Sequence, residues 1–209
     1  MPTTIYSTSN DSRQYRQNAT WSTARGDATT TGGLGTSSRY SNGVGSYISV
    51  GRGGSVYVIT RSYFEFDLSG ESGTVESADL KIYAFNQATP IVVGTDMIKL
   101  VAVKATALAH HGDDFGNVFS SGSTLGTEYC GRTDPPIVAA AYMTFTMNGD
   151  AISDINDAIG SGNFTVGIMS YKYDQQDNAP IATEFNKTLI YYQNWSGTSR
   201  DPKLELTYA

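Results

Sequence analysis

The chain has 209 residues, a net charge of −6, 22 glycines, 14 tyrosines and one cysteine. This length is enough for one large all-β domain or two small ones. The acidic charge argues against a nucleic-acid-binding protein, because such proteins need a basic surface. Since Cys130 has no second cysteine to pair with, an internal disulfide is excluded. We expect a buried or inert thiol at this position.

The start of the chain, residues 1–4 (MPTT), has neither the basic segment nor the apolar segment of a secretory signal. The longest apolar runs, such as residues 137–141, are too short to span a bilayer. We therefore expect a soluble protein that is made in a cytoplasm, is not exported by the general route and has no membrane partner.

The charge differs between the two ends of the chain. Residues 1–61 hold six arginines and two aspartates, a charge of +4, whereas residues 62–209 hold eight basic and eighteen acidic groups, a charge of −10. Residues 1–45 are also rich in Gly, Ser and Thr, and we expect a basic arm or loop segment in which residues 18–25 form a short irregular element anchored by Trp21. Residues 46–209 are expected to form the domain. An arm of this charge can dock on its own domain or on an acidic neighbour.

The clearest pattern is a pair of alternating stretches. Apolar and polar side chains alternate over residues 63–68 and again over residues 78–84, which is typical of strands with one buried face and one wet face. The gap at residues 69–73 is too short for a crossover helix and indicates a hairpin or an arch between two sheets. Tyr63 and Lys81 are expected on the wet faces. The core residues predicted from this pattern are Phe64, Phe66, Leu80 and Ile82.

Further strands are predicted where apolar residues alternate or cluster. The strand at residues 99–104 is expected to be covered on both faces. Residues 105–136 are the least patterned part and predict a long loop, either functional or packed on the domain. The other predicted strands are residues 47–50, 142–147, 164–168, 189–192 and 204–208.

One short helix is predicted after residue 149. Isoleucines at 152, 155 and 159 recur at helical spacing. Asp150 or Ser153 can cap the start of the helix, and Gly160 offers a left-handed stop at its end.

Residues with catalytic or metal-binding chemistry are few. His110 and His111 precede Asp113 and Asp114, but adjacent histidines on a strand point to opposite faces, and no third ligand follows at a suitable spacing. The chain also lacks the motifs of phosphate-binding loops, serine hydrolases and zinc proteases. We therefore expect no catalytic, cofactor-binding or metal-binding residues, and no enzyme.

Two stretches carry a family resemblance. Residues 61–69 (RSYFEFDLS) and 75–83 (VESADLKIY) resemble the core of the DNRLRE-type jelly-roll domains, which are similar to carbohydrate-binding modules and also occur in phage structural proteins. Residues 154–160, 164–168, 173–174 and 201–208 resemble the second half of that domain, so that the resemblance covers about residues 45–209. It implies an all-β, jelly-roll-type β-sandwich with one short helix, preceded here by an irregular N-terminal segment.

This resemblance leaves two functions open. The first is a non-enzymatic structural protein of a bacteriophage virion, such as a capsid decoration, fibre or tail accessory protein, that forms homo-oligomers and binds other virion proteins. The alternative is a carbohydrate-binding module or an adhesin for host glycans. Five residues near strand ends and polar loops are the candidates for glycan or interface contacts, namely Tyr171, Tyr173, Asp174, Tyr192 and Trp195.

Overall fold

A computed structural model describes residues 2–26, 33–34, 43–88, 95–106, 108, 112–121, 124–192 and 197–209. Antiparallel strands dominate this part of the chain. The large sheet consists of β1 (Thr3–Tyr6), β2 (Ser12–Asn18), β3 (Gly33–Leu34), β4 (Gly43–Gly51), β5 (Gly54–Asp67), β6 (Val75–Asn86), β7 (Leu100–Lys104), β10 (Ala141–Thr146), β11 (Asn163–Ser170), β12 (Phe185–Ile190) and β13 (Lys203–Tyr208). A small sheet consists of β8 (Phe119–Ser121) and β9 (Thr124–Leu125).

The helices are short. The α-helices are α1 (Trp21–Arg25) and α2 (Gly149–Ala158). Two turns of 3-10 helix are η1 (Gly112–Gly116) and η3 (Thr198–Arg200), and η2 (Tyr171–Gln175) is a single π-helical turn. The prediction of an all-β sandwich-like fold with few helices is thus confirmed.

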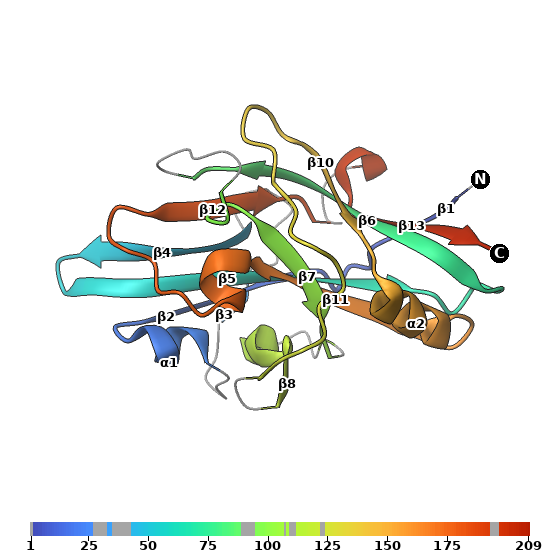
Figure 1. The fold of residues 1–209 in the computed structure, drawn as a ribbon, viewed down its shortest axis with the longest axis horizontal. Helices are drawn as coiled ribbons and strands as arrows, with labels where there is room; N and C mark the ends of the chain where they lie inside the picture. Colours follow the sequence, from blue (N-terminus) through green and yellow to red (C-terminus); the bar gives the residue numbers. More distant parts are fainter. Residues whose placement is uncertain are drawn as a thin grey trace.

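Two long strands organise the large sheet. β6 pairs with β10, β12 and β13, and β5 pairs with β2, β4 and β11. β12 also pairs with β4 and so joins the two halves of the sheet. Because β5 and β6 are not paired with each other, the turn between them is an arch and not a hairpin. Figure 1 shows strands stretched along the long axis, with α2 at one end and the β4–β5 turn at the other.

The buried face of β6 agrees with the prediction from its alternation. Leu80 and Ile82 are fully buried in the main core, together with Phe64 and Phe66 of β5. Lys81, on the opposite face, remains partly exposed and pairs with a carboxylate of β13. β6 therefore keeps one covered face and one open face.

The prediction of a wet face on β5 was wrong. Tyr63 has no exposed surface, and its hydroxyl donates to the carbonyl oxygen of Phe115 at 2.8 Å. Glu65 is 4 % exposed and accepts from Nδ2 of Asn10 at 2.6 Å. Residues distant in sequence cover this face. The alternation of apolar and polar side chains in β5 therefore shows which of the two sheet faces each side chain lies on, but not which face is exposed to water.

A glycine makes part of this covering possible. A Cβ atom at Gly167 of β11 would lie 2.5 Å from Cγ1 of Val118 and 3.3 Å from the ring of Tyr63. The segment before β8 therefore packs directly on the backbone of β11. Of the two expectations for residues 105–136, a functional loop or one packed on the domain, the described part shows packing, since Val118, Phe119 and Tyr129 belong to the main core.

Cys130 lies in the same core. Its thiol is 2 % exposed, and burial raises its pKa to about 12. The thiol therefore stays protonated and unreactive at neutral pH. His110 and His111 lie outside the described residues, and the described residues contain no group of three metal-binding side chains.

Much of the N-terminal segment is regular, against expectation. β1 pairs with β13 and β2 pairs with β5. β2 was missed because its buried side chains are polar, Ser12, Gln14 and Arg16, and so give no apolar alternation. The division of the chain at residues 45 and 46 stays a prediction, although this boundary falls within β4 and strands from both sides share one sheet.

The helix α2 was predicted correctly, but its cap was not. Asn148 caps the helix, because its side-chain oxygen accepts from the backbone N–H of Ala151 at 3.1 Å. Gly160 has a φ of +74° and ends the helix as expected. Ile155 is fully buried, and Ile152 packs beside it against the main core.

Candidate functional site

The structure buries four of the five predicted contact residues. Tyr171, Tyr173, Asp174 and Tyr192 have 6 %, 0 %, 0 % and 1 % of their surface exposed. A sugar that stacks on an aromatic ring, or a partner protein, needs exposed surface, so these four side chains are not available as contacts. Trp195 lies outside the described residues, and its role stays a prediction.

Asp174 has a structural role instead. Its carboxylate accepts two hydrogen bonds from the guanidinium of Arg61, from Nε at 2.7 Å and from Nη2 at 2.8 Å. Two further donors of Arg61 reach the carbonyl oxygens of Phe115, from Nη1 at 2.7 Å, and Arg25, from Nη2 at 2.9 Å. The Arg61–Asp174 pair therefore ties α1, β5, η1 and η2 together below the surface.

The predicted tyrosines are likewise committed to packing. Tyr192 stacks on Phe64 with ring centroids 5.7 Å apart, and its hydroxyl bonds with that of Ser62 at 2.7 Å. The ring of Tyr171 is covered by the guanidinium of Arg132 at 4.1 Å. Sequence reasoning placed these residues near loops correctly but could not see what covers them.

One broad surface of the sandwich remains open. It is formed by the outward side chains of β1, β6, β10 and β13, which the strand register places on one face. Across neighbouring strands, Tyr6 of β1 lies opposite Lys203 of β13. Lys81 of β6 lies opposite Lys203 on one side and opposite Thr144 of β10 on the other. We call this surface the open face; its side chains, all partly or fully exposed, are Thr4, Tyr6, Asp79, Lys81, Tyr83, Tyr142, Thr144, Thr146, Lys203, Glu205 and Thr207.

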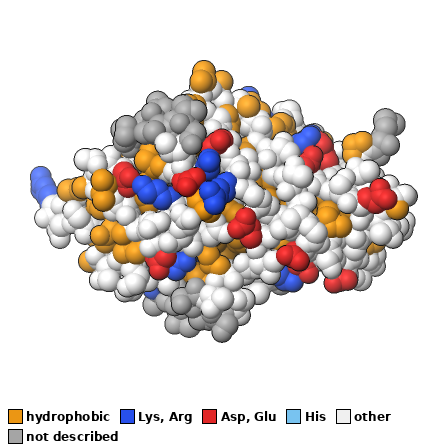
Figure 2. Space-filling view, in the orientation of Figure 1, with side chains coloured by type: hydrophobic (Ala, Val, Ile, Leu, Met, Phe, Trp, Pro, Cys, Tyr) orange, Lys and Arg blue, Asp and Glu red, His pale blue; other side chains and the backbone are white. Residues whose placement is uncertain are grey.

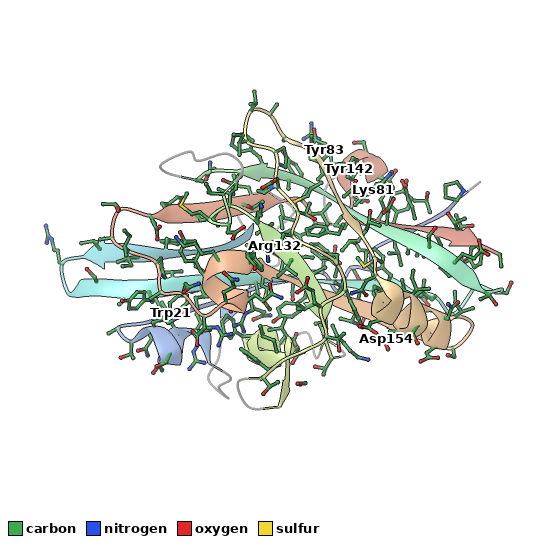
Figure 3. The ribbon with its side chains drawn as sticks, viewed as in Figure 1. Trp21, Lys81, Tyr83, Arg132, Tyr142 and Asp154 are labelled. Carbon is green, nitrogen blue, oxygen red and sulfur yellow. The ribbon has the colours of Figure 1, made fainter. Side chains whose placement is uncertain are left out.

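Tyrosines form a cluster at one side of the open face. The rings of Tyr142 and Tyr191 both meet Tyr83 edge to face, each with a centroid distance of 5.2 Å. The guanidinium of Arg200 lies 5.4 Å from the ring of Tyr83, and Nζ of Lys203 lies 5.0 Å from that of Tyr142. Figure 3 shows Tyr83 and Tyr142 beside each other. Rings held by such contacts are rigid, which suits recognition.

Charged groups of both signs line the rest of the open face. Glu205 accepts from Nζ of Lys81 at 2.5 Å and from Nζ of Lys203 at 2.9 Å, and these bonds lower the pKa of its carboxyl group. Asp79 accepts from the hydroxyl of Thr146 at 2.8 Å. A pocket of about 260 Å³ lies between these groups, with Ser77 and Thr207 also at its rim.

A larger cleft of about 510 Å³ lies between α2 and the ends of β7 and β11. Its best-defined group is Asp154, which accepts from Nζ of Lys104 at 2.8 Å and from the hydroxyl of Tyr129. Burial alone would raise the pKa of Asp154, but these two hydrogen bonds outweigh it and lower the pKa. The carboxylate is therefore ionised and occupied, which suits an anchor for α2 better than a general acid.

The charges elsewhere on the surface are also mixed. On the side shown in Figure 2, acidic and basic side chains lie next to one another in several places. Asp96, for example, forms an ion pair with Lys99 at 3.4 Å and another with Arg132 at 3.7 Å. These exposed pairs contribute little stability and mark no site by themselves.

Sequence reasoning missed the tyrosines of the open face, although a signal was present. Tyr83 occupies an outward position of a correctly predicted alternating strand, and Tyr142 begins another. What the sequence did not give is the register that pairs them, Tyr142 opposite Tyr83. Outward aromatic residues on two strands of one sheet are the feature to look for.

A comparison of the chain with known protein families and with curated proteins finds no match. The resemblance to DNRLRE-type domains therefore stays a prediction. Within the described residues, none of the helices has the length and apolar character needed to cross a membrane.

Proposed function

We propose that the chain is a non-enzymatic structural protein of a bacteriophage virion, and that it acts through protein–protein assembly at the open face. The observation that carries the assembly is the combination of partly exposed tyrosines with a strand at the rim of the sheet. Tyr6, on β1, is 41 % exposed, and β1 pairs with β13 alone in the part of the chain that the structure describes.

The chemistry of the open face suits contact with a second copy. Tyrosine supplies a large contact area at low entropic cost and is enriched in interfaces. A rim strand with a free edge can add a strand from a neighbour. The open face also carries both Lys81 and Asp79, so that two copies related by a two-fold axis can match unlike charges.

The virion part of the proposal rests on the resemblance of residues 61–69 and 75–83 to domains found in phage structural proteins. It is tested by mass spectrometry of purified particles of the phage that encodes the chain. Stoichiometric presence of the chain in washed particles supports a structural role. Its absence from particles would remove the virion part of the proposal and leave only the assembly.

Hydrogen exchange measured at low and high protein concentration tests the assembly itself. Amides of β1 and the outer edge of β10 should exchange more slowly at high concentration, because a second copy covers them. Amides of β7, which lies at the other end of the pairing path, provide the internal control. Exchange rates that are the same at both concentrations would contradict an interface at the open face.

Glycan binding is a second candidate function, favoured by the pocket of about 260 Å³ on the open face. Carboxylates of Asp79 and Glu205 and hydroxyls of Ser77 and Thr146 line this pocket and can bond sugar hydroxyls. A glycan array separates the two functions. Saturable binding of a neutral glycan by a protein that stays monomeric, lost in Asp79→Ala, would favour the alternative.

A further inference from the structure

A small pocket on the sheet is lined mostly by side chains that carry hydrogen-bond donors. It has a volume of about 230 Å³ and is formed by side chains of β2, β4, β5 and β12. None of its lining residues is a carboxylate. We call it the donor pocket; the side chains that matter here are Arg13, Tyr15, Gln17, Tyr47, Thr60 and Lys187.

The strand register explains why these residues meet. Tyr15 lies opposite Thr60, Thr60 lies opposite Gly45, and Gly45 lies opposite Lys187. Residues directly opposite in antiparallel strands share a face. A Cβ atom at Gly45 would lie 2.1 Å from the carbonyl oxygen of Asn186, so only glycine lets β12 bring Lys187 this close.

The two cations of the donor pocket are not neutralised by any carboxylate among the described residues. Of the six lysines, Lys187 alone forms no ion pair with a described carboxylate; the other five do. Arg13 forms none either, and its Nε atom is buried without a hydrogen-bond acceptor among the described residues. Burial, and then the charge of Arg13, lower the pKa of Lys187.

Such an arrangement is unfavourable unless a ligand completes it. Two partly buried cations repel each other, and a buried donor without an acceptor lowers the stability of the fold. The protein as a whole is acidic, with a net charge of −6, so the positive charge of the pocket is a local feature and not part of a basic surface. Both cations approach the same small space, which places the missing charge inside the pocket.

We propose that the donor pocket binds a phosphoryl group, either as inorganic phosphate or as a phosphate monoester. A phosphate monoester carries about −1.5 to −2 charges at neutral pH and has three acceptor oxygens. That charge matches Arg13 and Lys187 together, whereas one carboxylate would leave one of them unneutralised. The hydroxyls of Tyr15 and Tyr47 can donate to the oxygens that the two cations leave free.

Isothermal titration at constant ionic strength tests the proposal on the full chain. The probes are inorganic phosphate and glucose 6-phosphate, with acetate as the monovalent control. Saturable binding of one or both phosphates is expected, with acetate at least ten-fold weaker. Binding of the ester alone assigns the site to a phosphorylated sugar, and equal binding of both assigns it to the phosphoryl group itself.

Matched variants locate the site. Lys187→Met keeps the aliphatic stem, removes one charge and should weaken phosphate binding at least ten-fold; Arg13→Gln should do the same. Arg52→Gln and Lys99→Gln remove equal charges, from the exposed β4–β5 turn and from a residue paired with Asp96, and should leave binding unchanged. If Arg13→Gln does not fold, Lys187→Met decides the outcome alone.

Three results would overturn the proposal: no saturable binding of either phosphate, equal binding by Lys187→Met and the parent protein, or acetate binding as tight as phosphate. A fourth result would also overturn it: the parent protein forms an oligomer that does not respond to phosphate and that dissociates when Lys187 is replaced by Met. That result would assign the donor pocket to an acidic side chain of a second copy. The open face is not involved in the first three measurements, so failure there leaves the proposed assembly unaffected. The fourth result would instead place a contact between copies at the donor pocket.

Discussion

At the scale of residues, the unusual feature is a charged pair in the interior. Arg61 and Asp174 have no exposed surface, and the guanidinium also lies 4.0 Å from the ring centroid of Phe115. Taking two charges out of water is costly, and the geometry must compensate for that cost. Here every nitrogen of the guanidinium has an acceptor, two of them on the same carboxylate. The pair is therefore stable only while both members are present.

Asp174→Asn should lower the free energy of unfolding by about 3–5 kcal/mol, because it leaves the charge of Arg61 buried without a counter-charge. Asp96→Asn is the matched control, since Asp96 is 44 % exposed in its ion pairs and should cost only about 0–1 kcal/mol. Urea unfolding of the three proteins measures both changes. Equal midpoints for Asp174→Asn and the control would show that the pair contributes nothing.

Tyr63 gives a second test at this scale. The sequence predicts a wet side chain, whereas the structure shows full burial and a hydrogen bond to Phe115. Tyr63→Ala should therefore cost about 3–5 kcal/mol through the cavity that it leaves, and Tyr63→Phe about 1 kcal/mol through the lost bond. Lys81→Ala should cost much less than Tyr63→Ala. If Tyr63→Ala lowered the free energy of unfolding as little as Lys81→Ala does, the expectation from the sequence that Tyr63 is exposed to water would be supported instead.

At the scale of elements, alternation in the sequence located strands well but not their partners. β6 and β10 were found because Leu80, Ile82, Met143 and Phe145 alternate with polar residues. β2 was not, because its buried positions are polar and are satisfied by distant groups. The open face needs four strands in register, three of which come from parts of the chain far apart in sequence. Local pattern carries no information on such pairing.

The ion pair of Asp154 with Lys104 joins α2 to the end of β7 and makes stability depend on pH. Because the pKa of Asp154 is lowered in the folded state, its contribution is present above the ordinary carboxyl pKa of about 3.9 and is lost as the pH falls through the lower folded value. In this acid range, the difference in the free energy of unfolding between the parent protein and Asp154→Asn should disappear. Lys104→Met should remove most of the same dependence. Denaturant unfolding from pH 6 to pH 2.5 measures it, and parallel curves for parent and Asp154→Asn would contradict the anchoring role.

At the scale of the whole molecule, the structure has a buried ion pair, a strand β5 whose two faces are both covered, and one broad face that remains open. The features that sequence reasoning proposed for contact are buried, while the outward residues of β1, β6, β10 and β13 supply the accessible tyrosines and mixed charges. The donor pocket lies on other strands and adds a separate, small binding site. We infer that association of copies through the open face is the main use of this surface.

Sedimentation velocity over a wide range of protein concentration tests this inference most directly. The proteins are the parent, a Tyr6→Ser/Tyr142→Ser double variant of the open face, and Val50→Ser as the control. Val50 is 72 % exposed on β4, far from the open face, and loses a similar apolar contact area. The account predicts that the parent and Val50→Ser form a defined oligomer. The double variant should need at least a ten-fold higher protein concentration than the parent to form the same oligomer. A parent protein that stays monomeric at the highest concentration, or an oligomer unaffected by the double substitution, would contradict it.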